Sequence, residues 1–257
     1  MRLVAATTLG RHVLNLAARV STDLVTEVRH GSHRIRLAGG GWRVDYRMRT
    51  FSTKEPGTLR WLDELAPNDV LWDVGANVGL YTVYAAVARR VRVVAFEPSP
   101  FNLEFLARNI ALNAVHDLVS VVPVALSDRS RPASLSMTST EWGEGANTFG
   151  ETYGQSGRPI QDPTTFPTVG LTADDAVSSL RLPAPTHLKL DVDGIEGLIL
   201  KGAPAVLAGV RSVLVERPDF DEGSRLVTRM LTEAGLSLTP FNRTGRERAN
   251  EQWDRRG

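Results

Sequence analysis

The sequence predicts an α/β protein built on a doubly wound, mostly parallel sheet. From Val70 onward, apolar runs of strand length alternate with segments of helical periodicity. The first run, Val70 to Val74, passes through a loop containing Gly75 and Gly79 into a helix, an arrangement typical of sites that bind nucleotide-like cofactors. The second run ends in Glu97, which lies 22 residues beyond Gly75. An acid at that spacing is placed to accept hydrogen bonds from ribose hydroxyls.

The bulk composition limits the classes of function. A chain of 257 residues is long enough for one α/β domain with additions, and 42% hydrophobic with 23% charged residues is typical of a soluble globular protein. The formal net charge of +1 gives no overall field that would recruit nucleic acid. The absence of cysteine excludes a disulfide framework, a thiolate zinc site and a cysteine nucleophile.

Residues 1–53 are predicted to form an N-terminal extension of one helix and one β-hairpin. Apolar residues fall at helical spacing at Leu9, Val13, Leu16 and Val20. We expect this helix to pack on the main domain or on a subunit partner in a homo-oligomer, with contact to a membrane surface as the alternative. Charged residues interrupt the apolar run, so we expect no signal peptide, no membrane span and a cytoplasmic location.

The hairpin is predicted between His30 and Phe51, with Gly39 to Gly41 as its turn and Trp42 to Met48 as its second strand. A main domain is predicted from residue 54 to residue 241. It opens with a helix that begins near Pro56 and carries leucines at helical spacing up to Leu65.

Five further strands complete the predicted sheet, and they are Val91 to Phe96, Leu118 to Val124, His187 to Val192, Ser212 to Glu216 and Leu236 to Pro240. The helix around Leu198 to Leu207 is expected to be interrupted at Gly202 and Pro204. Between the third and fourth strands, Arg129 to Phe166 lacks periodicity, and its aromatic residues favour a loop that covers substrate over a disordered linker. The arginine-rich residues 242–257 are predicted to be a flexible basic tail, with a subunit contact through Trp253 as the alternative.

Acidic residues stand at or beside the end of every predicted central strand. They are Asp73, Glu97, Asp128 next to Ser127, Asp191 with Asp193, and Glu216. Because the carboxyl ends of parallel strands meet at one edge, these acids share a crevice that suits a cationic cofactor such as a sulfonium. Asp73 would repel a pyrophosphate and the third glycine of the dinucleotide fingerprint is missing, so the pattern favours S-adenosylmethionine (SAM) over NAD. A NAD(P)-dependent oxidoreductase is the alternative.

A second cluster, His187 to Glu196, reads HLKLDVDGIE. Lys189 and Asp191 are two residues apart in a strand and therefore face the same side. Three interpretations remain open for the carboxylates of this cluster. The carboxylates include a general base that removes a hydroxyl proton, or they bind a hard divalent cation, or they form a solvated turn with a Lys–Asp pair.

Six segments together resemble the FkbM family of SAM-dependent methyltransferases. They are KEPGT at Lys54 to Thr58, DVGANVGLYTVYAA at Asp73 to Ala86, AFEPSPFNLEFLARNIALN at Ala95 to Asn113, VALSD at Val124 to Asp128, KLDVDGIE at Lys189 to Glu196 and LVE at Leu214 to Glu216. The resemblance implies a Rossmann-like class I methyltransferase fold. It also implies methyl transfer from SAM, commonly to a hydroxyl of a small molecule such as a sugar or a polyketide-type natural product.

The resemblance also implies roles for individual residues. The cofactor would be held by Glu55, Thr58, Asp73, Gly75, Ala76, Asn77, Gly79, Tyr81, Glu97, Pro98, Asn102, Ser127 and Asp128. Asp191, with Lys189, would serve as the catalytic base, and Asp191, Asp193 and Glu216 would be the ligands if a divalent cation is used. Asp193 stands where the family often has glutamate, and a SAM-binding module that has lost catalysis is therefore a further alternative.

Overall fold

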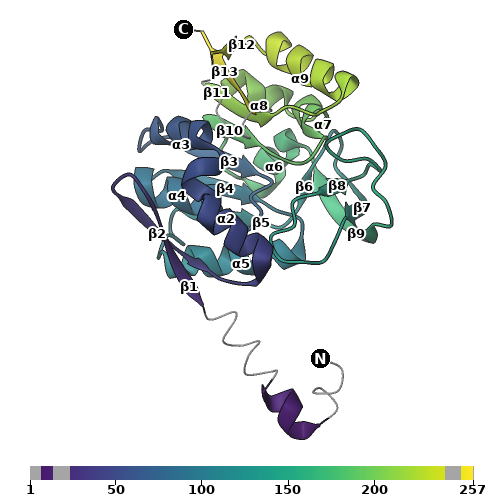
Figure 1. The fold of residues 1–257 in the computed structure, drawn as a ribbon. Coiled ribbons are helices and arrows are strands. Elements are labelled where there is room, and N and C mark those ends of the chain that lie inside the picture. The colour runs from purple at the N-terminus through teal and green to yellow at the C-terminus, as the bar shows by residue number, and fades with distance from the viewer. Residues whose placement is uncertain (1–6, 14–23, 241–249, 257) are drawn as a thin grey trace.

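The computed structural model describes residues 7–13, 24–240 and 250–256. At its centre lies a seven-stranded sheet in the order β12-β13-β11-β10-β3-β4-β5 (Figure 1). Five adjacent strands are parallel, and they are β5 (Val119–Val122), β4 (Arg92–Phe96), β3 (Val70–Val74), β10 (His187–Leu190) and β11 (Ser212–Glu216). The predicted doubly wound, mostly parallel sheet is confirmed.

Side-chain alternation along the strands divides the core into two layers. In β3, Leu71 packs on one face of the sheet, whereas Trp72 and Val74 pack on the other. The first face is covered by α2 (Gly41–Lys54), α3 (Pro56–Asp63), α4 (Leu80–Arg89) and α5 (Pro100–Leu112). The second face is covered by α6 (Ala173–Leu180), α7 (Glu196–Lys201), α8 (Pro204–Gly209) and α9 (Asp221–Glu233). The gap between α7 and α8 confirms the predicted interruption at Gly202 and Pro204.

The strand order reverses between β3 and β10. From β3 the chain builds outward through β4 to β5, and it then returns to place β10 and β11 on the opposite side of β3. At such a switch point the loops that follow the two strands diverge and leave a crevice at the carboxyl edge.

The predicted hairpin is present, but its boundaries are wrong. It pairs β1 (Val25–His30) with β2 (His33–Ala38) through a turn at Gly31 and Ser32. The segment Trp42 to Met48, predicted as a strand, lies in helix α2, because Val44, Met48 and Phe51 recur at helical spacing and are all buried. A Cβ on Gly40 would collide with the ring of Phe105, so the glycines let α2 enter close to α5.

The segment Arg129 to Phe166 is more ordered than its lack of periodicity predicts. It contributes to a second sheet of four strands in the order β6-β9-β7-β8, which are β6 (Ala125–Leu126), β9 (Thr164–Leu171), β7 (Arg131–Met137) and β8 (Asn147–Phe149). This sheet lies against the second face of the core near β5 and α6 (Figure 1). Only residues 138–163, apart from β8, form the connecting loop.

The prediction of a flexible tail is wrong for residues 250–255. They form β13 (Asn250–Arg255), which lies antiparallel between β11 and β12 (Leu236–Thr239). Its alternating pattern buries Glu251 and Trp253, and the pairing with two neighbours supplies backbone partners that a polar sequence does not reveal. The rest of the predicted tail, apart from Arg256, lies outside the described residues. Among the described strands, β12 is therefore the edge strand, and it joins the sheet through β13.

The N-terminal helix is described over part of its predicted length. Residues 8–13 are helical, with Leu9 and Val13 exposed, whereas Leu16 and Val20 lie outside the described residues. Within the described segments, no helix has both the length and the apolar character required to cross a bilayer.

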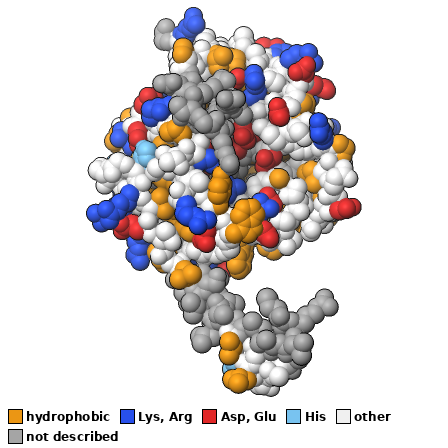
Figure 2. Space-filling model, viewed as in Figure 1, with side chains coloured by type: hydrophobic (Ala, Val, Ile, Leu, Met, Phe, Trp, Pro, Cys, Tyr) orange, Lys and Arg blue, Asp and Glu red, His pale blue; other side chains and the backbone are white. Residues whose placement is uncertain are grey.

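On the face drawn in Figure 2, basic and acidic side chains are interspersed over the surface.

We expect Trp253→Ala to destabilise the protein by about 3–5 kcal/mol, because the indole is 5% exposed and its removal leaves a cavity against the sheet. Thermal or urea unfolding followed by circular dichroism measures this loss. Trp42→Ala, at a position that is 61% exposed, is the matched control and should change the free energy of unfolding by less than about 1 kcal/mol. Equal effects of the two substitutions would show that β13 contributes little to the folded state.

Candidate functional site

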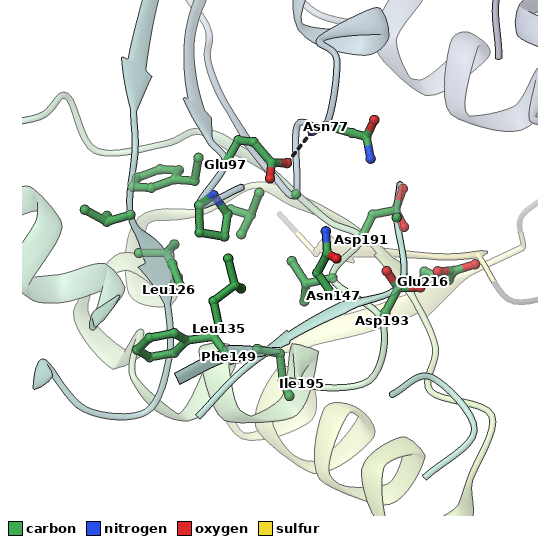
Figure 3. Close-up of a pocket in the computed structure, with 18 of the residues that line it drawn as sticks. Asn77, Glu97, Leu126, Leu135, Asn147, Phe149, Asp191, Asp193, Ile195 and Glu216 are labelled. Carbon is green, nitrogen blue, oxygen red and sulfur yellow. Dashed lines mark hydrogen bonds between the residues drawn. The ribbon is translucent and has the colours of Figure 1, made fainter. Parts of the chain in front are cut away.

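A pocket opens at the switch point, at the carboxyl ends of β3, β4, β10 and β11. It encloses about 880 Å³ of empty space, its open mouth included. The lining residues come from strand ends, from α2 and from the small sheet, and they are Arg47, Lys54, Val74, Gly75, Asn77, Phe96, Glu97, Pro98, Val124, Ala125, Leu126, Leu135, Gly145, Asn147, Phe149, Asp191, Val192, Asp193, Ile195 and Glu216. Figure 3 shows its two ends, one mostly apolar and the other carrying three carboxylates.

The glycine loop that follows β3 forms one wall. Gly75 and Gly79 have φ angles of 80° and 82°, in the left-handed region that favours glycine. A Cβ on Gly75 would collide with the backbone carbonyl oxygen of Asp191, so glycine here permits the β3 and β10 strand ends to approach each other. Asn77 is also left-handed, with φ of 52°, and its side-chain amide donates to the carbonyl of Glu144 at 2.8 Å.

Glu97 lies at the end of β4, facing the glycine loop. Its carboxylate accepts backbone N–H bonds from Asn77 at 2.7 Å and from Ser99 at 2.9 Å (Figure 3). Burial raises the pKa of Glu97 from 4.5 to about 7 even though these donors favour the charged form. A carboxylate offers about four acceptor positions, so capacity remains for hydroxyl donors of a ligand.

The opposite side of this end is apolar. Leu126, Leu135 and Phe149 point into the pocket beyond Glu97 (Figure 3). Asn147 lies between these apolar side chains and the carboxylate end (Figure 3), and its buried side-chain oxygen Oδ1 has no hydrogen-bond partner. A buried acceptor without a donor is costly, and one that lines a pocket is available to a ligand.

A buried ion network stands behind the pocket. The ammonium of Lys189 lies 3.3 Å from Asp73 and 3.1 Å from Asp191, and the Lys189 side chain is 4% exposed. Asp73 also accepts a 2.6 Å hydrogen bond from the hydroxyl of Thr82 in α4. Burial lowers the pKa of Lys189, but the two carboxylates outweigh burial and the net shift is upward. Lys189 is therefore a fixed cation, and Asp73 is its partner rather than an exposed cofactor ligand.

The segment between α2 and α3 extends this network. Glu55 accepts hydrogen bonds from the Tyr81 hydroxyl at 2.9 Å and from Lys54 at 2.6 Å. The ring of Tyr81 lies 5.3 Å from the Lys189 ammonium, close enough for a cation–π contact. Thr58 is fully buried and lies 3.4 Å from Glu55. Within the KEPGT segment, Lys54 lines the pocket, whereas Glu55 and Thr58 support its wall from behind.

Three carboxylates, Asp191, Asp193 and Glu216, line the charged end of the pocket (Figure 3). Burial raises the pKa of Asp191, but the charges of Lys189 and Lys54 lower it by a larger amount, so the net shift is downward. Burial and the charge of Asp191 raise the pKa of Glu216 to about 10, so at neutral pH Glu216 holds a proton and shares it with Asp191 in a hydrogen bond. Burial also raises the pKa of Asp193. Across the described segments, no group of three His, Cys, Asp or Glu side chains has a spacing suited to a metal ion.

The predicted site residues fall into two groups. Those that line the pocket are Gly75, Asn77, Glu97, Pro98, Asp191, Asp193 and Glu216. Those that lie behind its walls are Glu55, Thr58, Asp73, Ala76, Gly79, Tyr81, Asn102 and Lys189, together with Ser127 and Asp128. Asp128 pairs at 3.7 Å with Lys201 and at 3.5 Å with Arg129, away from the cavity, and its neighbours Ala125 and Leu126 provide the wall instead.

Four residues that line the pocket were not predicted as site residues from the sequence, and they are Arg47, Asn147, Leu135 and Phe149. Arg47 was hidden because its segment was predicted as a strand of the hairpin, although Val44, Met48 and Phe51 carry the helical signal. The other three belong to the small sheet, whose strands are rich in Ser and Thr and show no clear apolar alternation.

We expect Lys189→Met to destabilise the fold by about 3–5 kcal/mol, since it leaves Asp73 and the buried part of Asp191 without their cation. Chemical unfolding at pH 7 measures the loss. The exposed Lys201→Met is the control, because its side chain is 60% exposed and its pair with Asp128 is worth little. A loss no greater than that of the control would mean that the buried pair does not stabilise this edge.

Comparisons with known proteins agree on one family. Residues 73–235 match the methyltransferase FkbM domain. The chain is 30% identical over 185 residues to the hexuronic acid methyltransferase AglP of Haloferax volcanii, covering 71% of this chain and 70% of that protein. It is 26% identical over 200 residues to the 31-O-demethyl-FK506 methyltransferase FkbM of Streptomyces tacrolimicus, covering 70% and 77%.

A solved structure shares the fold. The methyltransferase FkbM of Methylobacillus flagellatus superimposes with a TM-score of 0.52 at 12% identity, over 84% of this chain and 62% of the other, so this chain spans less than two thirds of that protein. The sheet order, the glycine loop and these matches favour a methyltransferase over the nicotinamide-dependent alternative. The chain belongs to the FkbM family of methyltransferases.

Proposed function

We propose that this protein transfers a methyl group from SAM to a hydroxyl of a small acceptor, such as a sugar or a polyketide-type natural product. The observation that carries the proposal is that the two ends of one pocket differ in chemical character. Glu97 and an apolar wall form one end, a carboxylate cluster forms the other, and the unpartnered amide oxygen of Asn147 lies between them. The two relatives, a hexuronic acid methyltransferase and a 31-O-demethyl-FK506 methyltransferase, support both acceptor classes.

The described residues fit the cofactor. Glu97 has acceptor capacity for ribose hydroxyls, and Leu126 and Phe149 offer apolar surface for an adenine ring. The unpartnered Oδ1 of Asn147, between the two ends, has capacity for a donor group of the cofactor. The backbone at Gly75 would border the methionine part, and the nearby carboxylates suit a sulfonium and an ammonium group. When bound, SAM would supply the electrophilic methyl carbon for the acceptor oxygen.

A hydroxyl must lose its proton during or before methyl transfer, and the pair of Asp191 and Glu216 is the proposed acceptor of that proton. The pair already shares one proton at neutral pH, with Asp191 as the ionised member. Lys189 holds the Asp191 carboxylate at 3.1 Å and fixes its direction. Lys189, Lys54 and the hydrogen bond from Glu216 all lower the pKa of Asp191, so this carboxylate accepts the hydroxyl proton only as the oxygen–methyl bond forms and the oxygen becomes strongly acidic.

Calorimetric titration with SAM, S-adenosylhomocysteine and NAD tests the cofactor. We expect the first two to bind and NAD not to bind. Since ribose hydroxyls donate to an ionised carboxylate, and Glu97 is ionised only above about pH 7, affinity for S-adenosylhomocysteine should fall about tenfold from pH 8 to pH 6. Glu97→Gln should bind more weakly and remove this pH dependence. Binding of NAD alone, or no binding of SAM, would refute the proposal.

Asp191→Asn should retain SAM binding and lose about 10²- to 10⁴-fold in turnover, since the amide cannot accept the hydroxyl proton. Radiolabelled methyl transfer to a panel of hydroxylated acceptors measures the rate, and calorimetry measures cofactor binding. Asp117→Asn, at an exposed surface position, is the matched control. An unchanged turnover in Asp191→Asn would remove this residue from the reacting centre.

A further inference from the structure

Helix α2 borders a second cleft next to the pocket. The cleft encloses about 700 Å³ of empty space, open solvent included, and is lined by Trp42, Arg43, Tyr46, Arg47, Lys54 and Gly143. Arg43 and Arg47 are one helical turn apart, on a stripe distinct from the buried stripe that ends at Phe51. The lining thus holds three cations and two aromatic rings but no carboxylate. α2 lies on the side of the molecule drawn in Figures 1 and 2, where basic, acidic and apolar side chains are interspersed.

The cleft adjoins the pocket of the proposed reaction. Arg47 and Lys54 line both cavities, and the pocket reaches from them to Asp191 and Glu216. An acceptor whose hydroxyl lies near Asp191 can therefore extend along α2. The cleft lies on the acceptor side of the site, since Glu97 and the apolar wall do not line it.

Only one of the three cations lacks a carboxylate partner. Arg43 pairs with Glu141 at 2.9 Å and with Glu144 at 3.1 Å, and Lys54 pairs with Glu55 at 2.6 Å. Arg47 donates its Nε hydrogen to the carbonyl of Gly143 at 3.0 Å, and it forms no ion pair with any carboxylate of the described residues. Its charge acts on the carboxyls of Asp193 and Glu97 without a direct ion pair to either, so its terminal N–H groups offer a planar set of donors at the border of the two cavities.

We propose that α2 forms an acceptor subsite for a hydroxylated ring that carries one carboxylate, as in a sugar acid, with Arg47 binding the carboxylate. This inference rests on the proposed function. Arg47, the cation of the cleft that forms no ion pair, matches the single charge of a carboxylate. Its planar guanidinium group matches the planar geometry of the carboxylate. Trp42, which is 61% exposed, and Tyr46 provide aromatic surface for the faces of a sugar ring.

The alternative role for Arg47 is to bind the carboxylate of the cofactor itself. The two roles differ in what a substitution changes. If Arg47 serves the acceptor, Arg47→Gln weakens binding of the acidic acceptor and leaves cofactor affinity unchanged. If it serves the cofactor, the same substitution weakens binding of S-adenosylhomocysteine first.

The experiment uses methyl glucuronide, methyl glucoside and glucose 6-phosphate as probes. Calorimetry measures their affinities for the full chain with and without saturating S-adenosylhomocysteine, and radiolabelled SAM measures methyl transfer. We expect at least a tenfold preference for the glucuronide over the glucoside, and a weaker gain for the phosphate. Arg47→Gln should remove about 10- to 100-fold of glucuronide affinity and none of the cofactor affinity.

Arg49→Gln on the same helix is the matched control, because Arg49 is exposed and lines neither cavity. Arg47→Lys should recover part of the lost affinity, and circular dichroism confirms that each variant is folded. Equal affinity for glucuronide and glucoside in the unsubstituted protein would overturn the inference, as would a primary loss of cofactor binding in Arg47→Gln. Failure of SAM to bind, with glucuronide binding that still depends on Arg47, would instead refute the proposed function and leave the subsite intact.

Discussion

The buried ammonium of Lys189 is the interaction on which the site depends. It lies between Asp73 at the end of β3 and Asp191 just after β10, the two strands on either side of the switch point. Without it, two carboxylates would face each other in a region of low dielectric, where an unpaired charge costs several kcal/mol. Thr82 in α4 bonds the same Asp73, and Tyr81, whose ring lies beside the ammonium, bonds Glu55 directly before α3. One cation thus fixes the relative positions of two strands and two helices.

The carboxyl groups around this cation have pKa values that differ from those of isolated side chains. Glu196 is fully buried and accepts backbone N–H bonds from Val192 at 3.1 Å and from Gly194 at 3.1 Å, which shapes the loop that carries Asp193. Burial raises the pKa of Glu196 to about 7. Between about pH 4.5 and pH 7 the unfolded chain ionises these two carboxyls, Glu97 and Glu196, while the folded protein keeps them protonated, so stability decreases as pH rises across that range and these groups add no further loss above it. Such destabilising groups are retained where ligand binding requires them.

The sequence predicted the parts of the fold in which local pattern and burial agree. The apolar runs of β3, β4, β10 and β11 identified the central strands, and the acids at their ends identified the edge that carries the pocket. Elements that depend on distant partners were not predicted. The polar strand β13 is defined by pairing with β11 and β12, and β7 by pairing with β9, so neither shows a strong local signal. Arg47 reaches the pocket only because α2 packs across it, and such packing cannot be read from spacing.

The insertion of β13 between β11 and β12 imposes an order on assembly. β12 precedes β13 in the chain, yet its hydrogen bonds to the sheet run through β13. During synthesis, the ribosome releases β12 and α9 before the strand that must hold β12 in place. Until residues 250–255 emerge and pair with Ser212 to Glu216, β11 presents an unpaired hydrophobic edge on which another chain could add a strand. The late strand therefore covers an edge of the sheet that is otherwise open to pairing with another chain.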